Sequence, residues 1–174
     1  MRVKRSLIVA IAALAVMGTN SVQAATSKPA ANPYGASTID PPAPGATVLI
    51  LSKGGVVKKY SLAQIEAMGT KTITIFEPFV KKTQTFNVIA LSDLFKIVGI
   101  KSSDKVVTSA LNDYAYTNTA ANFVAANGYL AVKRDGKDIP YDQGGPDRII
   151  FPNTSKWAKF LDPWNWSLSS IAVK

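Results

Sequence analysis

The residues from Gly144 to Arg148 have the types from which a small-molecule site could be built. Two glycines, a proline and an Asp-Arg pair stand here directly before an apolar run. Glycine lets a ligand approach the main chain closely, and a guanidinium offers a planar fork of donors for a carboxylate, a phosphate or a ring carbonyl edge. The alternative is a plain strand connection in which Arg148 forms an ion pair with Asp113, Asp142 or Asp147.

Two further groups of side chains could complete such a site. Asn112, Asp113 and Tyr114 follow apolar residues at the end of a predicted strand, where loop residues often meet ligands. The alternative is an ordinary long loop, which Asn and Asp also favour. Trp164 and Trp166 lie on one side of the chain if their segment is extended, so an indole could stack on a flat heteroaromatic ring whose amino edge binds a carboxylate. Their alternative is core packing or edge cover.

The chain contains no cysteine and no histidine. Their absence excludes disulfides, thiol nucleophiles, metal sites built from thiolate or imidazole, haem ligation through either residue, and a Ser-His-Asp triad. Any chemistry would therefore depend on carboxylates, lysine, tyrosine or a bound cofactor. The sequence predicts no catalytic residue and no metal ligand from the protein.

The N-terminal segment, 1–24, has the form of a secretory signal peptide. A basic start precedes an apolar run that begins at Leu7, and small residues at Val22 and Ala24 predict cleavage before Ala25. The apolar run is about half of the roughly 20 residues that a membrane span needs, so a retained anchor is the less favoured alternative. We therefore expect an exported protein, periplasmic or extracellular.

Composition divides the rest of the chain into two parts. Residues 25–46 are rich in alanine, proline, serine and glycine, which predicts a flexible or partly extended tether, and one globular domain is expected over 47–174. The chain has 20 basic and 11 acidic residues, and Arg2, Lys4 and Arg5 belong to the predicted signal peptide. The remaining positive charge is spread out and accompanies no nucleic-acid-binding motif. It indicates solubility, and no nucleic-acid partner is expected.

Hydrophobic periodicity predicts a mainly β domain with two short helices, of mixed α+β class. A Ser-x-x-Gln capping box opens the helix expected over 61–69, and Ser92 is expected to cap the helix over 91–99. Gly54 and Gly55 suit a tight hairpin. The predicted strands are 47–51, 56–61, 72–76, 83–89, 105–111, 128–134, 147–151 and 170–174.

These segments, in this order, resemble the oxidoreductase molybdopterin-binding domain, which has the fold of sulfite oxidase. The resemblance extends over about 47–174 and rests on SLAQIEAMG, TITIF, FNVIALSDLFKIVG, ALNDYAY, GYLAVKRDGKDIP, GGPDRIIFP and a closing segment rich in tryptophan. It implies a mainly β, mixed-sheet or barrel-like fold with short helices. In that family the glycine-proline-arginine turn lies beside the pterin cofactor, which would place Gly144, Gly145 and Arg148 at the ligand.

One departure from the family pattern concerns the metal. The family's enzymes bind molybdenum through a cysteine thiolate after the strand that corresponds to TITIF, whereas FEPFVKKT contains no cysteine. The chain is instead similar to small exported members of this fold that lack the metal site. Some of these bind a simple pterin and work with membrane-bound cyclic-di-GMP enzymes.

The resemblance implies a non-catalytic, exported pterin-binding protein that acts as a sensor for a membrane-bound signalling protein. The expected ligand is a pterin or a molybdopterin-like molecule. Its predicted contacts are Asn112, Asp113, Tyr114, Gly144, Gly145, Arg148, Trp164 and Trp166. Two alternatives stay open: a molybdopterin-dependent oxidoreductase, or a subunit of one, with an unusual metal site, and an interaction module that has lost the pocket.

Overall fold

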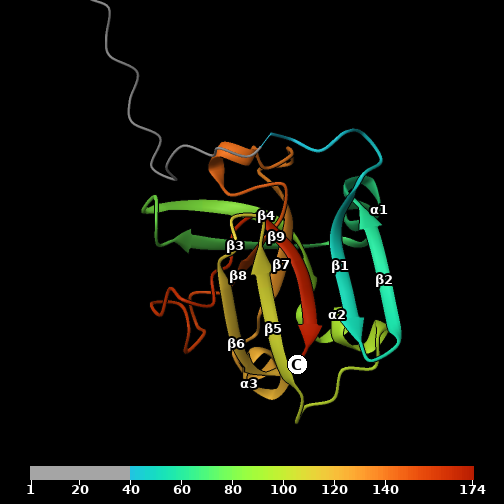
Figure 1. Cartoon of the computed structure of the whole chain (residues 1–174). Helices are drawn as coiled ribbons and strands as arrows, with labels where there is room; N and C mark the ends of the chain where they lie inside the picture. Colours follow the sequence, from blue (N-terminus) through green and yellow to red (C-terminus); the bar gives the residue numbers. More distant parts are fainter. Residues whose placement is uncertain (1–39) are drawn as a thin grey trace, which may run out of the picture. The chain divides into compact units, whose positions relative to one another are not determined.

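The computed structural model describes residues 40–174, and Figure 1 shows how their helices and strands are arranged. The predicted signal peptide and the predicted tether up to residue 39 lie outside the described residues. Within 40–174 the strands form one five-stranded and one four-stranded sheet, accompanied by three short α-helices. The predicted α+β class is confirmed, but the sheets are open and do not close into a barrel.

The five-stranded sheet has the order β2-β1-β9-β5-β6. Its members are β1 (Thr47–Lys53), β2 (Val56–Ser61), β5 (Lys105–Ala110), β6 (Ala115–Thr119) and β9 (Leu168–Val173). The last strand, β9, lies in the middle of this sheet, parallel to β1 and antiparallel to β5 (Figure 1). The segment just before β9 therefore leads directly into the central strand of the sheet, which fixes the position of its C-terminal end.

The four-stranded sheet has the order β3-β4-β7-β8, and all its neighbours are antiparallel. Its members are β3 (Lys71–Glu77), β4 (Lys82–Ala90), β7 (Tyr129–Arg134) and β8 (Arg148–Ile150). An isolated antiparallel bridge joins Arg148 to Trp166. This bridge brings the glycine-proline turn before β8 beside the tryptophan-rich segment before β9.

The first two helices, α1 (Leu62–Met68) and α2 (Leu91–Ile97), lie where the sequence predicts them. The capping box of α1 is confirmed, because the backbone N–H of Ser61 donates to Gln64 Oε1 at 2.8 Å. The prediction that Ser92 caps α2 is wrong, because the chain is already helical from Leu91 and Ala90 is the N-cap residue.

The polar stretch after β5 contains two elements that the sequence did not predict. Residues 115–119 form β6, which pairs with β5, and α3 (Ala120–Ala125) follows directly. Thr119 caps α3 by accepting a hydrogen bond from the backbone N–H of Asn122 at 3.3 Å. Pairing with β5 and a local cap therefore replace the long loop that the composition suggested.

The hydrophobic core draws on both sheets and on all three helices. Side chains without exposed surface include Leu49, Ile65, Phe86, Phe123 and Ile171. Apolar burial of this kind stabilises a fold by roughly 25 cal/mol per Å², so a domain of this size can be stable without disulfides. No helix among the described residues is long and apolar enough to cross a membrane.

Candidate functional site

A cavity of about 240 Å³ opens between the β3–β4 turn, the β5–β6 turn and the segment before β9. We call it the aromatic pocket. Its lining residues are Phe79, Ala110, Asn112, Tyr114, Leu161, Asp162, Trp164, Asn165 and Trp166. The structure therefore brings together Asn112, Tyr114, Trp164 and Trp166 of the predicted contacts, from segments about 50 residues apart in the sequence.

A tight turn after β5 places Asn112 and Tyr114 at the pocket. Asp113 has a positive φ of 66°, which Asp tolerates better than most residues, and Asn112 Oδ1 accepts a hydrogen bond from the backbone N–H of Tyr114 at 3.3 Å. The Tyr114 hydroxyl donates to the carbonyl oxygen of Asp162 at 2.8 Å. Asp113 itself is exposed and does not line the aromatic pocket, so its contact with a ligand stays a prediction.

The surroundings of Tyr114 favour the protonated form of its phenol. Burial raises its pKa above the usual range, and the nearby charge of Asp162 adds to this shift. At neutral pH the hydroxyl is therefore a hydrogen-bond donor that stands at the pocket wall.

Aromatic rings form the opposite wall. Phe79, in the turn at the end of the β3–β4 hairpin, packs edge to face against Trp166 with a centroid distance of 4.4 Å and against Trp164 at 6.1 Å. Trp164 is buried, and its Nε1 donates to the carbonyl oxygen of Trp157 at 2.9 Å. Trp164 therefore packs as part of the core, whereas Trp166 is only partly buried.

Arg148 lies behind this wall. Its side chain is fully buried, its guanidinium stands over the Trp166 ring at 4.7 Å, and its Nη2 donates to Glu77 Oε1 at 2.5 Å. The predicted alternative of an ion pair is right in kind, and the carboxylate that the structure shows is that of Glu77 at the end of β3, which the sequence analysis did not consider. Arg148 does not line the aromatic pocket, so its direct contact with a ligand stays a prediction.

The two glycines of the turn lie against other parts of the chain. Gly144 has a φ of +83°, and a Cβ there would approach the Trp166 ring to 3.1 Å. A Cβ on Gly145 would lie 1.8 Å from the carbonyl oxygen of Ile139. Glycine is thus required at these positions by backbone geometry and close packing, and neither residue lines the aromatic pocket.

Asn165 is a pocket residue that the sequence reasoning missed. It is buried, and its Nδ2 donates to the carbonyl oxygen of Thr108 at 2.9 Å. Its Oδ1 has no hydrogen-bond partner within the described part of the chain, although buried acceptors usually have one. The available signal was a polar residue between Trp164 and Trp166, where a continuous core would have an apolar one.

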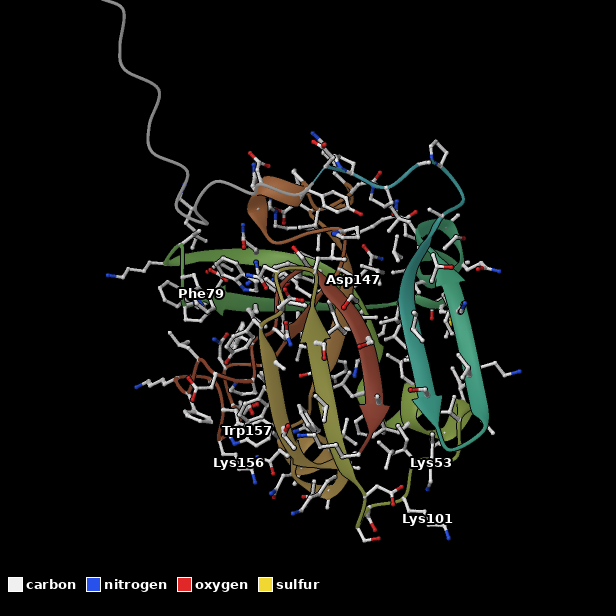
Figure 2. All side chains as sticks on the ribbon, in the orientation of Figure 1. Lys53, Phe79, Lys101, Asp147, Lys156 and Trp157 are labelled. Atoms are coloured by element: carbon white, nitrogen blue, oxygen red, sulfur yellow. The ribbon has the colours of Figure 1, made fainter. Side chains whose placement is uncertain are left out.

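A second buried polar residue, Asp147, directly follows the glycine-proline turn. Asp147 is fully buried, and no side chain among the described residues hydrogen-bonds its carboxyl group. Burial raises its pKa well above the usual range, and a backbone contact with Leu168 offsets only part of that shift. Burial, together with the charge of Asp147, raises the pKa of Tyr141 to about 12. Figure 2 labels Asp147 in the interior of the domain.

The donor set does not suit a metal held by the protein. The described residues contain no group of three or more His, Cys, Asp or Glu that could hold an ion, and the sequence offers no thiolate. The described residues that line the aromatic pocket also include no lysine or arginine. They present flat aromatic surface, an unpaired amide oxygen and a hydroxyl, which suits an uncharged heteroaromatic ring.

The family model described as "Oxidoreductase molybdopterin binding domain" matches residues 60–167. The chain therefore belongs to this family, as the sequence motifs predict.

The fold is similar to that of a solved enzyme. The sulfane dehydrogenase SoxCD from Paracoccus pantotrophus matches with a TM-score of 0.59 and 11% sequence identity, over 80% of this chain and 40% of that chain. At this identity the likeness shows the fold alone, and the chain spans less than half of the length of that protein. A search of curated protein sequences found no match.

Proposed function

We propose that this protein is an exported, non-catalytic pterin-binding protein. The observation that carries the proposal is the aromatic pocket, which combines ring surfaces with an unpaired amide oxygen and lies in a domain of the molybdopterin-binding family. A pterin needs an aromatic face, acceptors for its amino-pyrimidine edge and a donor for its ring carbonyl.

Each of these demands has a residue in the pocket. Phe79 and Trp166 offer the ring surface, and Asn165 Oδ1 and the Asp162 carboxylate can accept from the amino edge. The Tyr114 hydroxyl can donate to the ring carbonyl by exchanging its present bond to the Asp162 carbonyl oxygen for one to the ligand. Pairing with a ligand would relieve the cost of the buried Asn165 oxygen, which is roughly 1–3 kcal/mol for an unsatisfied group.

Pocket size and charge favour a simple pterin over molybdopterin. Molybdopterin carries a phosphate, for which proteins provide arginine, lysine or a helix N-terminus, and the described lining has no cationic side chain. The volume of about 240 Å³ is also below the roughly 300–1,000 Å³ of sites for drug-sized ligands. When bound, a pterin would supply its own redox chemistry, while the residues here would bind and orient it.

Tryptophan fluorescence of the mature protein, titrated anaerobically with tetrahydrobiopterin and corrected for ligand absorbance, tests the proposal. We expect saturable quenching at micromolar ligand. Asn165→Leu removes the unpaired acceptor and should weaken binding about tenfold, which corresponds to the roughly 1.4 kcal/mol of one good hydrogen bond. Asp93→Asn, on the exposed surface of α2 and outside the lining, is the control. Folded protein that shows no response to the pterin would contradict the proposal.

The proposal extends to export and signalling. Export is supported by the predicted signal peptide, and the signalling role by the resemblance to exported pterin-binding regulators. The proposed partner is a membrane-bound signalling enzyme. Fractionation of cells that express the full chain should recover it outside the cytoplasm. Cross-linking should join it to a membrane enzyme whose activity changes with pterin, and a protein confined to the cytoplasm would contradict this part.

A further inference from the structure

One buried carboxylate, Glu77, is linked to both Phe79 and Trp166, two rings of the aromatic wall of the pocket. Glu77 and Arg148 have no exposed side-chain surface, and Glu77 Oε1 accepts a hydrogen bond from Arg148 Nη2 at 2.5 Å. The other carboxylate oxygen, Oε2, accepts from the backbone N–H of Val80 at 2.7 Å. Both oxygens of Glu77 are therefore committed, each to a different segment of the chain.

Each of these contacts leads to one ring of the aromatic wall. Val80 follows Phe79 in the β3–β4 turn, so its bond to Glu77 fixes the backbone that carries the Phe79 ring. Arg148 holds its guanidinium over the Trp166 ring at 4.7 Å, a distance at which a cation is attracted to the ring face. The two rings then meet at 4.4 Å.

We infer that Glu77 is the positioning residue of the aromatic pocket: its carboxylate sets Phe79 through the turn and Trp166 through Arg148. The inference rests on the proposed function for the identity of the ligand. A pocket whose walls are fixed before binding does not lose affinity to the ordering of side chains, and supporting residues of this kind decide how well a site fits. Glu77 acts through its neighbours, because it does not line the pocket itself.

The Glu77→Asp variant separates positioning from simple charge neutralisation. Aspartate keeps the negative charge beside Arg148 but is one methylene shorter, so it cannot hold both the guanidinium and the Val80 N–H. We expect tetrahydrobiopterin to bind this variant about tenfold more weakly than it binds the wild type. If Glu77→Asp does not fold, Glu77→Gln, which keeps the length of the side chain, is measured in the same way.

Asp104→Asn is the control variant. Asp104 pairs with Lys53 at 2.5 Å, and neither residue lines the aromatic pocket. Figure 2 shows Lys53 on the side of the domain away from Phe79. Loss of this ion pair should leave ligand affinity unchanged, so a general loss of stability is distinguished from a loss of positioning.

A measurement without ligand keeps the inference testable if no pterin binds. Labelling with 5-fluorotryptophan gives fluorine resonances that Trp→Phe variants assign. In Glu77→Asp the Trp166 resonance should shift or broaden while the Trp157 resonance, from a ring packed on Phe123 and Phe151, stays unchanged. Absence of pterin binding by the wild type would overturn the proposed function alone. An unchanged Trp166 resonance in folded Glu77→Asp would overturn the positioning role.

Discussion

Two buried carboxylates lie near the start of β8 and differ in what faces them: Asp147 directly precedes that strand, and Glu77 pairs with Arg148, its first residue. Glu77 and Asp147 both have no exposed surface. Glu77 has a guanidinium and a backbone N–H, whereas Asp147, next to Arg148 in the chain, has no side-chain hydrogen bond among the described residues. Burial alone therefore does not give a carboxylate its role. The paired group organises the pocket, whereas burial raises the pKa of the other, Asp147, well above the usual range.

Loss of the Glu77–Arg148 ion pair should have the largest effect on the free energy of unfolding. Arg148→Met leaves the Glu77 charge buried without its cation, so the free energy of unfolding should fall by about 3–5 kcal/mol. Urea denaturation measures this loss. The double variant Glu77→Leu/Arg148→Met should recover most of the stability, since removal of both charges is often nearly neutral. A single variant that loses less than about 1 kcal/mol would show that the pair is not energetically coupled.

The glycine-proline turn before Asp147 and Arg148 is the next feature to disrupt. Gly145→Ala would place a Cβ 1.8 Å from the carbonyl oxygen of Ile139, so the backbone must shift and stability should fall by about 1–3 kcal/mol. Gly55→Ala, with no heavy atom within 4 Å of its Cβ, is the matched control. Equal unfolding midpoints in urea for the two variants would contradict the close packing of this turn.

The buried carboxyl group of Asp147 should make the stability of the protein depend on pH. Because the pKa of Asp147 is raised in the folded state, the unfolded state loses its proton first as pH rises through the ordinary value near 4. The free energy of unfolding then falls with rising pH up to the folded-state pKa. Asp147→Asn removes this contribution, so the variant should gain stability relative to the wild type as pH rises from 4 toward 8. Melting temperatures from pH 4 to 8 test it, and an identical pH slope in both proteins would contradict it.

The smallest effect is expected at Tyr141. Its buried hydroxyl has no hydrogen-bond partner among the described residues, so Tyr141→Phe should change stability by less than about 0.5 kcal/mol. Tyr114→Phe, which loses the bond to the Asp162 carbonyl, should cost about 0.5–1.5 kcal/mol in the same thermal melts. A larger loss of stability in Tyr141→Phe than in Tyr114→Phe would contradict this expectation. It would mean that the Tyr141 hydroxyl pairs with Asp147, so that Asp147, like Glu77, has a hydrogen-bond partner.

Local patterns in the sequence were enough to predict much of the fold. Strand alternation, the capping box at Ser61 and the order of the motifs predict most elements and the family. The strand β6 and the helix α3 were missed because polar residues dominate that stretch, and pairing with β5 decides its conformation. Local composition carries no record of such a partner strand.

The site could be predicted only in part for a similar reason. Asn112, Tyr114 and the tryptophans could be selected by residue type, and the structure brings them to one pocket. The partner of Arg148 is 71 residues away in the sequence, at the end of β3, and β3 and β8 lie at opposite edges of the four-stranded sheet, so only the tertiary fold brings the two side chains together. The roles of Gly144 and Gly145 likewise depend on Trp166 and Ile139, which only the tertiary fold brings close.

A crystal structure of the mature protein with tetrahydrobiopterin tests the central claim most directly. The account predicts the pterin ring in the aromatic pocket against Phe79 and Trp166, with its amino edge on Asn165 Oδ1 and no change at the Glu77–Arg148 pair. A pterin bound elsewhere on the domain, or an empty pocket in crystals grown at saturating ligand, would contradict it.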